Sequence, residues 1–142
     1  MSNKTKAIIF SIASLILISF GWYKQTHLSV WGFNLPKSDI KEVIFYRGDH
    51  TYKVTDKDIV LKIAKKASKM KRYSKTDNFN SIPNLEYKKL LILTKDNINY
   101  GGSIWNGENI VLINSNGYCW ELNYKNLSKT LNRSIKNATL LN

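Results

Sequence analysis

A run of 17 residues without a charged side chain, Ala7 to Tyr23, lies near the start of this chain. As an α-helix the run would be about 26 Å long, at the lower limit for crossing a hydrocarbon core of about 30 Å. Lys4 and Lys6 precede it, and Trp22 and Tyr23 end it, as aromatic residues do at a membrane interface. Basic residues that flank a membrane helix stay on the cytoplasmic side of the membrane. The pattern therefore predicts a membrane helix with the rest of the chain outside.

Residues 1–23 fit two roles. They form either an uncleaved signal anchor, giving a single-pass protein of the cell membrane, or a secretory signal peptide cleaved near Gly21. A buried core helix is disfavoured, because the run is apolar on all sides and has no polar face. The sole cysteine, Cys119, lies far from the run, which excludes a lipid-modified cysteine next to it. We favour the anchor, and in both cases we expect the C-terminal domain outside.

The rest of the chain divides into a linker, a domain and a tail. We expect a linker over residues 24–37, a small extracytoplasmic domain over 38–136 and a frayed tail over 137–142. A domain of about 100 residues buries about two-thirds of its unfolded surface, so it can hold a core without disulfide bonds. One cysteine cannot form an internal disulfide in any case.

Short apolar runs separated by turn dipeptides predict an antiparallel sheet. Two strands are expected at 40–47 and 50–55, joined by the turn Gly48-Asp49. After a polar loop over 73–86, four further strands are expected as a meander, and their runs read YKKLLILT, INYGGSIW, ENIVLI and YCWEL. The turn dipeptides between them are Asp96-Asn97, Asn106-Gly107 and Asn116-Gly117. The pair Gly101-Gly102 inside one run predicts a β-bulge.

Two segments have the period of an α-helix. The first is expected from about Asp56 to Arg72, with Thr55 and Asp58 as a capping pair. Its apolar stripe consists of Ile59, Val60, Ile63, Ala64, Ala67 and Met70. The second is expected over 124–136, and its apolar line consists of Leu127, Leu131 and Ile135. The order ββα-ββββ-α predicts a small α+β domain, with two helices packed on a mostly antiparallel sheet.

This order and four segments resemble a family of small bacterial domains. The segments are TYKVTDKDIVLKIAKKASKMKR, EYKKLLILTKDN, SIWNGENIVLI and GYCWELNYKNLSKTL, within about Ile40 to Ile135. They are similar to the YhfM-like domains of low-GC Gram-positive bacteria, which are extracytoplasmic domains of unknown function and often lipoproteins. The resemblance implies a fold and a location, and it implies no activity. This chain departs from the lipoprotein members because it has no cysteine where a lipid would attach.

Residues that carry metal or nucleophilic chemistry are few and scattered. His27, His50 and Cys119 form no spaced cluster of the three or four ligands that zinc requires. Cys119 has no histidine near it in the sequence to activate it, so we expect a packed side chain rather than a nucleophile. Asp56 and Asp58 are explained by their place in a first helical turn. We therefore expect no enzyme, no catalytic or metal-binding residue and no cofactor.

The balance of charge is strongly basic. The formal net charge is +12, and after the N-terminal segment 19 cations stand against 10 acids. Only three of all the cations are arginine, the residue that bidentate phosphate sites favour, so we expect no nucleic acid as a partner. At about 100° per residue, four cations of the first helix cluster opposite its apolar stripe. This candidate basic face consists of Lys62, Lys65, Lys69 and Arg72.

The basic face is either a solvated surface or a binding site for something negative. Outside the membrane, the candidates are an anionic envelope component or a secreted acidic protein. The sequence therefore predicts a non-catalytic cell-envelope binding or accessory module, membrane-anchored or secreted, of unknown ligand and unknown oligomeric state. The alternative is an immunity- or inhibitor-type protein that binds a secreted partner protein.

Overall fold

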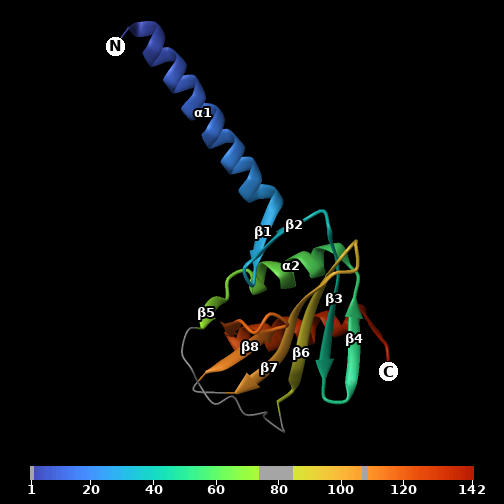
Figure 1. Ribbon diagram of the computed structural model, residues 1–142. Coiled ribbons are helices and arrows are strands. Elements are labelled where there is room, and N and C mark those ends of the chain that lie inside the picture. Colours follow the sequence, from blue (N-terminus) through green and yellow to red (C-terminus); the bar gives the residue numbers. More distant parts are fainter. Residues whose placement is uncertain (1, 74–84, 107–108) are drawn as a thin grey trace.

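The structure is a computed structural model that describes residues 2–73, 85–106 and 109–142. A long N-terminal helix leads into a domain in which two further helices pack on an antiparallel sheet (Figure 1). The helices are α1 (Asn3–Thr26), α2 (Lys57–Ala67), α3 (Tyr124–Ser134) and the 3₁₀ helix η1 (Ile135–Asn137). The strands are β1 (His27–Val30), β2 (Phe33–Pro36), β3 (Ile40–Arg47), β4 (His50–Val54), β5 (Lys71–Tyr73), β6 (Tyr87–Thr94), β7 (Asn99–Asn106), β8 (Ile110–Asn114), β9 (Cys119–Glu121) and β10 (Ala138–Leu140). The predicted α+β fold class is confirmed.

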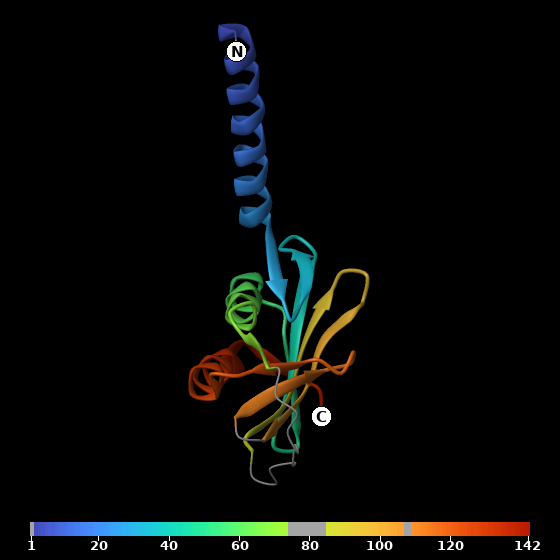
Figure 2. The same cartoon turned by 60° about the vertical axis from the view of Figure 1, so that its left-hand side comes forward.

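Eight strands form one antiparallel sheet, in the order β10-β4-β3-β6-β7-β8-β9-β5. The strands β1 and β2 form a separate hairpin. Both α2 and α3 cover the same face of the large sheet (Figure 2). Their buried apolar residues join the core, and these are Val60, Ile63, Ala64, Ala67, Leu127 and Leu131. The apolar lines predicted for the two helices are thus the faces that pack on the sheet.

The structure departs from the linker predicted over residues 24–37. These residues first complete α1, which ends at Thr26, and then form the β1–β2 hairpin. The turn residues Trp31 and Gly32 have φ angles of 51° and 85°. Such left-handed pairs suit two-residue hairpin turns, because their twist matches that of the strands. The hairpin follows α1 directly, so the domain begins at the end of the helix.

Trp31 joins this hairpin to the core. Its side chain is 1% exposed, and its Nε1 donates to the Sδ of Met70 at 3.1 Å. Its carbonyl oxygen accepts a hydrogen bond from the Nδ2 of Asn114 at 3.2 Å. A β-carbon on Gly101 would lie only 2.8 Å from the indole ring, so a glycine is required beneath it. A segment that looks like a linker in the sequence is therefore part of the packed domain.

The helix predicted from Asp56 to Arg72 is shorter in the structure. The N-cap is Asp56 rather than Thr55, because the Asp56 Oδ1 accepts from two backbone N–H groups at 3.0 and 3.1 Å. The helix ends at Ala67, and after a turn over residues 68–70 the chain forms β5, which pairs with β9. This pairing buries Tyr73 and covers the outer edge of β9, which a longer helix would leave without partners.

The tail predicted to be frayed over 137–142 also differs. Its residues Ala138–Leu140 form β10 and pair antiparallel with β4. The backbone N–H of Thr51 donates to the Oδ1 of Asn142 at 2.8 Å. Without this strand, β4 would present a row of unpaired backbone groups at the sheet edge. The tail is held because it supplies those partners.

The glycine pair in β7 does not form the predicted bulge. The pairing of β6 with β7 continues through Gly101 and Gly102 without a shift in register. Both residues instead permit close approach of neighbouring backbone. A β-carbon on Gly101 would lie 2.3 Å from the carbonyl oxygen of Leu90, and one on Gly102 would lie 1.8 Å from that of Ile113. The register shifts of the sheet occur between β3 and β6.

The turns of the sheet that the structure describes agree with the sequence. Gly48, Asn97 and Gly117 have φ angles of 57°, 61° and 80°, as expected where turn dipeptides reverse the chain. The predicted loop over 73–86 lies largely outside the described residues, and so does one residue of the Asn106-Gly107 turn. The meander itself is confirmed by the antiparallel pairing of β6, β7, β8 and β9.

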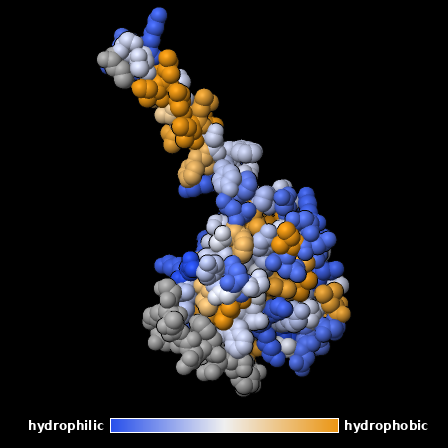
Figure 3. Space-filling model, in the orientation of Figure 1, coloured by the Kyte–Doolittle hydropathy of each residue, from blue (hydrophilic) through white to orange (hydrophobic). Residues whose placement is uncertain are grey.

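α1 stands apart from the core. It has no buried residue, and its exposed large apolar side chains run from Ile8 to Tyr23. Figure 3 shows them along the middle of the helix on the face in view. Among the described residues it is the one helix long and apolar enough to cross a membrane. At its end, Asn34 Nδ2 donates to the hydroxyl of Tyr23 at 2.6 Å, and the Tyr23 ring stacks on His27 with centroids 4.1 Å apart. These contacts join the last turns of α1 to the hairpin.

Candidate functional site

Exposed cations lie along α2 and α3 and on the residues that directly follow these helices. We call this surface the basic helical layer, and it consists of Lys62, Lys65, Lys66, Lys69, Lys125, Lys129, Arg133 and Lys136. All of these residues are exposed except Lys66, which is half-buried. No acid lies on α3, and the single acid within α2 is Asp58, in its first turn. The cations on these two helices therefore outnumber the acids.

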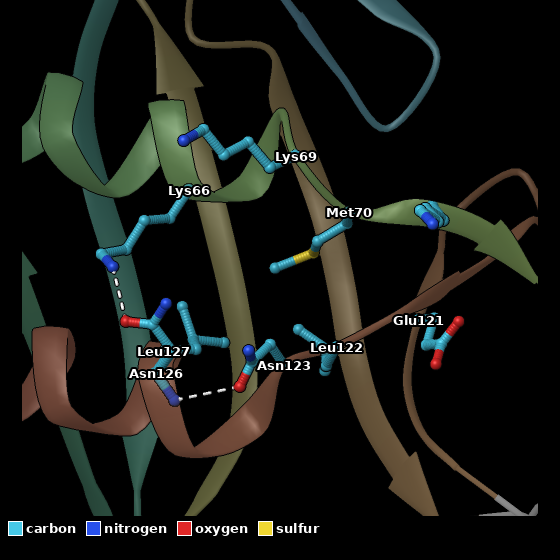
Figure 4. A pocket seen from close by; sticks show the side chains of 9 residues that line it. Lys66, Lys69, Met70, Glu121, Leu122, Asn123, Asn126 and Leu127 are labelled. Carbon is cyan, nitrogen blue, oxygen red and sulfur yellow. Dashed lines mark hydrogen bonds between the residues drawn. The ribbon is translucent and has the colours of Figure 1, made fainter.

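A cleft opens in this layer where the C-terminal end of α2 approaches the N-terminal end of α3. It has a volume of about 540 Å³. Its lining comprises Lys66, Lys69, Met70, Lys71, Glu121, Leu122, Asn123, Asn126 and Leu127 (Figure 4). The Nζ of Lys66 donates to the Oδ1 of Asn126 at 2.7 Å, so the two helices meet across the cleft through a polar contact. Three lysines face one carboxylate here.

The apolar part of the cleft and its amides come from definite places in the fold. Met70, Leu122 and Leu127 pack against or belong to the core, so they are fixed from below. Asn123 is the N-cap of α3, and its side chain accepts from the backbone N of Asn126 at 3.4 Å. The cleft thus combines ammonium groups at its rim, amides on one side and an apolar floor.

The four cations of the predicted basic face do not stay together. Lys69 lines the cleft, whereas Lys62 and Lys65 are exposed on α2 outside it. Arg72 lies on β5, and its guanidinium sits 4.0 Å from the centre of the Tyr118 ring, in cation–π geometry. The prediction of one helical face with Arg72 on it is therefore wrong, because the chain leaves the helix after Ala67.

Sequence reasoning missed half of the layer and most of the cleft. Lys66 and Lys71 flank the apolar stripe on a helical projection, yet both line the cleft. The cations of α3 could have been found by the same count of charges that identified the first helix, because residues 124–136 contain no acid. Nothing in the sequence places Glu121 and Asn126 beside α2, because that contact spans about half of the chain.

Other reactive groups are separate from the cleft. Burial raises the pKa of the half-buried Cys119 thiol, which disfavours the thiolate that a nucleophile requires. His27 stacks on Tyr23 at the end of α1, and His50 begins β4. Within the described part of the chain, no group of three or more histidine, cysteine or carboxylate side chains is placed to hold a metal.

Two tyrosines fix α3 on the sheet and so position one wall of the cleft. The hydroxyl of Tyr124 accepts from the backbone N of Tyr87 at 3.1 Å. The hydroxyl of Tyr87 donates to the Oδ1 of Asn132 at 3.0 Å. Burial raises the pKa of both phenols above the ordinary value of 10.0. The Tyr87 hydroxyl needs its proton to donate to Asn132, whereas the bond that Tyr124 accepts lowers the pKa of Tyr124 and is outweighed by burial, where the anion would be poorly solvated.

We expect the free energy of unfolding to be independent of these tyrosines below about pH 10 and to fall at higher pH. Unfolded phenols lose their protons near pH 10, whereas the folded phenols retain theirs because their pKa is raised, so alkali favours the unfolded state. Urea unfolding across this range measures the effect. Tyr87→Phe keeps the ring and should lose stability less steeply above pH 10. Equal pH dependence in the two proteins would contradict this assignment.

Comparisons with known proteins found no match to a family model, to a curated protein or to a solved structure. The resemblance to the YhfM-like domains therefore stays a prediction. The features that bear on function are the helix α1, the basic helical layer and the cleft between α2 and α3.

Proposed function

We propose that this protein is a membrane-anchored, extracytoplasmic binding module that performs no catalysis. Its α1 crosses the cytoplasmic membrane once, and its domain holds an anionic component of the cell envelope against the basic helical layer. The observation that carries the proposal is the cleft between α2 and α3, which is lined by Lys66, Lys69 and Lys71 and lies next to the exposed cations of α3. Lysines on an exposed surface attract polyanions without the fixed geometry that a catalytic site needs.

The anchor is supported by the geometry of α1. Its 24 residues span about 36 Å, which exceeds a hydrocarbon core of about 30 Å. Lys4 and Lys6 lie in its first turn, and Lys24 follows the apolar run at its end. The helix α1 continues without a break through Gly21 and the residues before it. The stretch considered as a cleavage site is therefore helical rather than extended. We therefore propose that the leader is retained, with the N-terminus inside.

Binding of inorganic polyphosphate by the full chain, held in nanodiscs of zwitterionic lipid, tests the layer. Each lysine close to an anionic surface contributes about 1 kcal/mol, so reversing three of them should weaken binding by at least about 100-fold. The variant carries Lys66→Glu, Lys125→Glu and Lys129→Glu. A matched control carries Lys41→Glu, Lys53→Glu and Lys88→Glu, which make the same change in net charge on the strands.

The two variants separate a specific layer from net charge alone. The control should retain most of the affinity of the unchanged protein, because its substitutions lie off the two helices. Equal weakening in both variants, or no binding of polyphosphate by the unchanged protein at low salt, would overturn the proposed function.

A further inference from the structure

The charged residues of the domain are distributed unevenly between the end that meets α1 and the side formed by α2 and α3. The end that meets α1 comprises the hairpin, the turn between β2 and β3 and the turn between β6 and β7 (Figures 1 and 2). The helix α2 lies next to the hairpin, and Met70, just after α2, is hydrogen-bonded to Trp31 of the hairpin. Hydrogen bonds tie these parts together. The backbone N of Lys37 donates to the carbonyl oxygen of Thr26 at 2.8 Å, and that of Lys95 donates to the carbonyl oxygen of Asp39 at 2.9 Å. This membrane-proximal end is one connected surface.

Apart from the cations of α2 beyond its first turn, that membrane-proximal end is close to neutral. It carries five lysines, which are Lys24, Lys37, Lys41, Lys57 and Lys95. It also carries five carboxylates, which are Asp39, Glu42, Asp56, Asp58 and Asp96. Three of these ammonium groups already donate hydrogen bonds. Lys37 donates to the carbonyl oxygen of Gln25, Lys41 to the Oδ1 of Asn97 at 3.3 Å, and Lys57 to the carbonyl oxygen of Ile40 at 2.6 Å. A surface with this balance has little net attraction for anionic lipid headgroups.

The basic helical layer faces a different direction. Figure 2 shows α2 next to the hairpin and α3 beyond it, farther from α1. Packed helices lie about 8–10 Å apart, which is about one Debye length at physiological ionic strength. The cations of α3 are therefore largely screened from the bilayer in which α1 is anchored. A partner that reaches the cations of α3 approaches the side of the domain, whereas the cleft lysines lie closer to the hairpin.

The cleft adds a chemical preference to this positive charge. Lys69 and Lys71 can pair with phosphate groups, and Lys66 has further N–H groups to do so while it keeps its bond to Asn126. Glu121 also lines the cleft, so its lining carries three positive charges against one negative charge. The floor of Met70 and Leu127 offers contact only to carbon. The amides of the two asparagines can bond hydroxyl groups. A single phosphate ion would leave the floor unused. None of the nine residues that line the cleft is aromatic, so the stacking on which single-stranded nucleic acid relies is missing there.

We propose that the cleft between α2 and α3 binds a linear polymer of polyol units joined by phosphodiesters. The phosphates pair with the three cleft lysines, and the carbon chain between them lies over the apolar floor. The polymer continues across the exposed lysines of α3. This inference rests on the proposed function and deepens it, because it names the class of anion.

The test compares three probes at equal phosphate concentration, with the full chain in nanodiscs of zwitterionic lipid. The probes are synthetic poly(glycerol phosphate), vesicles of phosphatidylglycerol and single-stranded DNA. The cleft variant carries Lys66→Gln, Lys69→Gln and Lys71→Gln. A control outside the cleft carries Lys53→Gln, Lys62→Gln and Lys65→Gln, none of which lines the cleft or lies on α3. Circular dichroism establishes that each variant is folded before its binding is measured.

We expect the polyol polymer to bind more tightly than the other two probes. The cleft variant should lose about 100-fold in affinity for it, at about fivefold for each lysine, and the control should lose less than about fivefold. Raising the salt from 50 to 200 mM should weaken binding by about 50-fold if about four phosphates are paired. This salt dependence alone would follow from any polyanion, so the comparison of variants decides the site.

Three results would overturn the inference. The first is tighter binding of the vesicles, which would make the bilayer the partner. The second is equal or tighter binding of DNA, and the third is equal weakening of polymer binding by the cleft variant and its control. If one of these results were found but polyphosphate binding still depended on the basic helical layer, the proposed function would stand and only this inference would fall. Failure of every anion to bind would remove both.

Discussion

Replacing Trp31 with alanine is expected to lower the free energy of unfolding of the domain by about 3–5 kcal/mol. The indole is buried against Gly101, and its Nε1 donates to Met70. Removing it empties a large volume in the core, which the rigid strands around it cannot refill. The same residue holds the hairpin that connects α1 to the sheet, so its loss also frees that connection. Urea unfolding of the full chain in detergent, followed by far-ultraviolet circular dichroism, measures the change.

The matched control is Trp22→Ala. Trp22 is the same residue type on α1, where it is 65% exposed and contacts none of the core, so its removal should leave the unfolding transition of the domain unchanged. Equal stability of the Trp31 variant and the control would mean that the hairpin is not part of the cooperative unit. Residues 24–37 would then behave as the linker that the sequence predicts.

Placing two arginines in the middle of α1 is expected to move the protein out of the membrane fraction. Ile12→Arg and Leu15→Arg lie near the centre of the uncharged run, and each arginine costs about 2.5–3.5 kcal/mol at such a position. Together they oppose insertion by about 6 kcal/mol, which is enough to reverse it for a single helix of this length. Fractionation of cells followed by alkaline extraction measures how much protein stays in the membrane.

Two controls separate charge in the bilayer from charge in general. Ile12→Leu with Leu15→Ile keeps the segment apolar and should remain in the membrane. Gln25→Arg adds a charge beyond the apolar run, where arginine is tolerated at the interface, and should also remain. Retention of the double-arginine protein would show that the domain, and not α1, binds the membrane, and it would remove the anchor from the proposed function.

The functional site was predictable only in part. Lys69 was recognisable as one cation of a basic helix, because helical spacing is a local property. The place of Arg72 was not, since its conformation depends on the pairing of β5 with β9 rather than on its neighbours in the sequence. Lys66 gains its role from Asn126, which lies 60 residues further along the chain. A site formed between two helices cannot be read from either helix alone.

The sequence by itself determined the features that arise within a few residues. The uncharged run gives α1, turn pairs such as Gly48-Asp49 give the hairpins, and the apolar stripes give the buried faces of α2 and α3. The tertiary structure decided the rest: the burial of Trp31, the strands β5 and β10, and the cleft. The physical reason is that an open sheet edge needs a strand to pair with and an unfilled core needs a side chain to occupy it. Whichever segment the fold brings near can supply these. Those partners are selected by packing and backbone pairing at long range, and local propensity does not encode them.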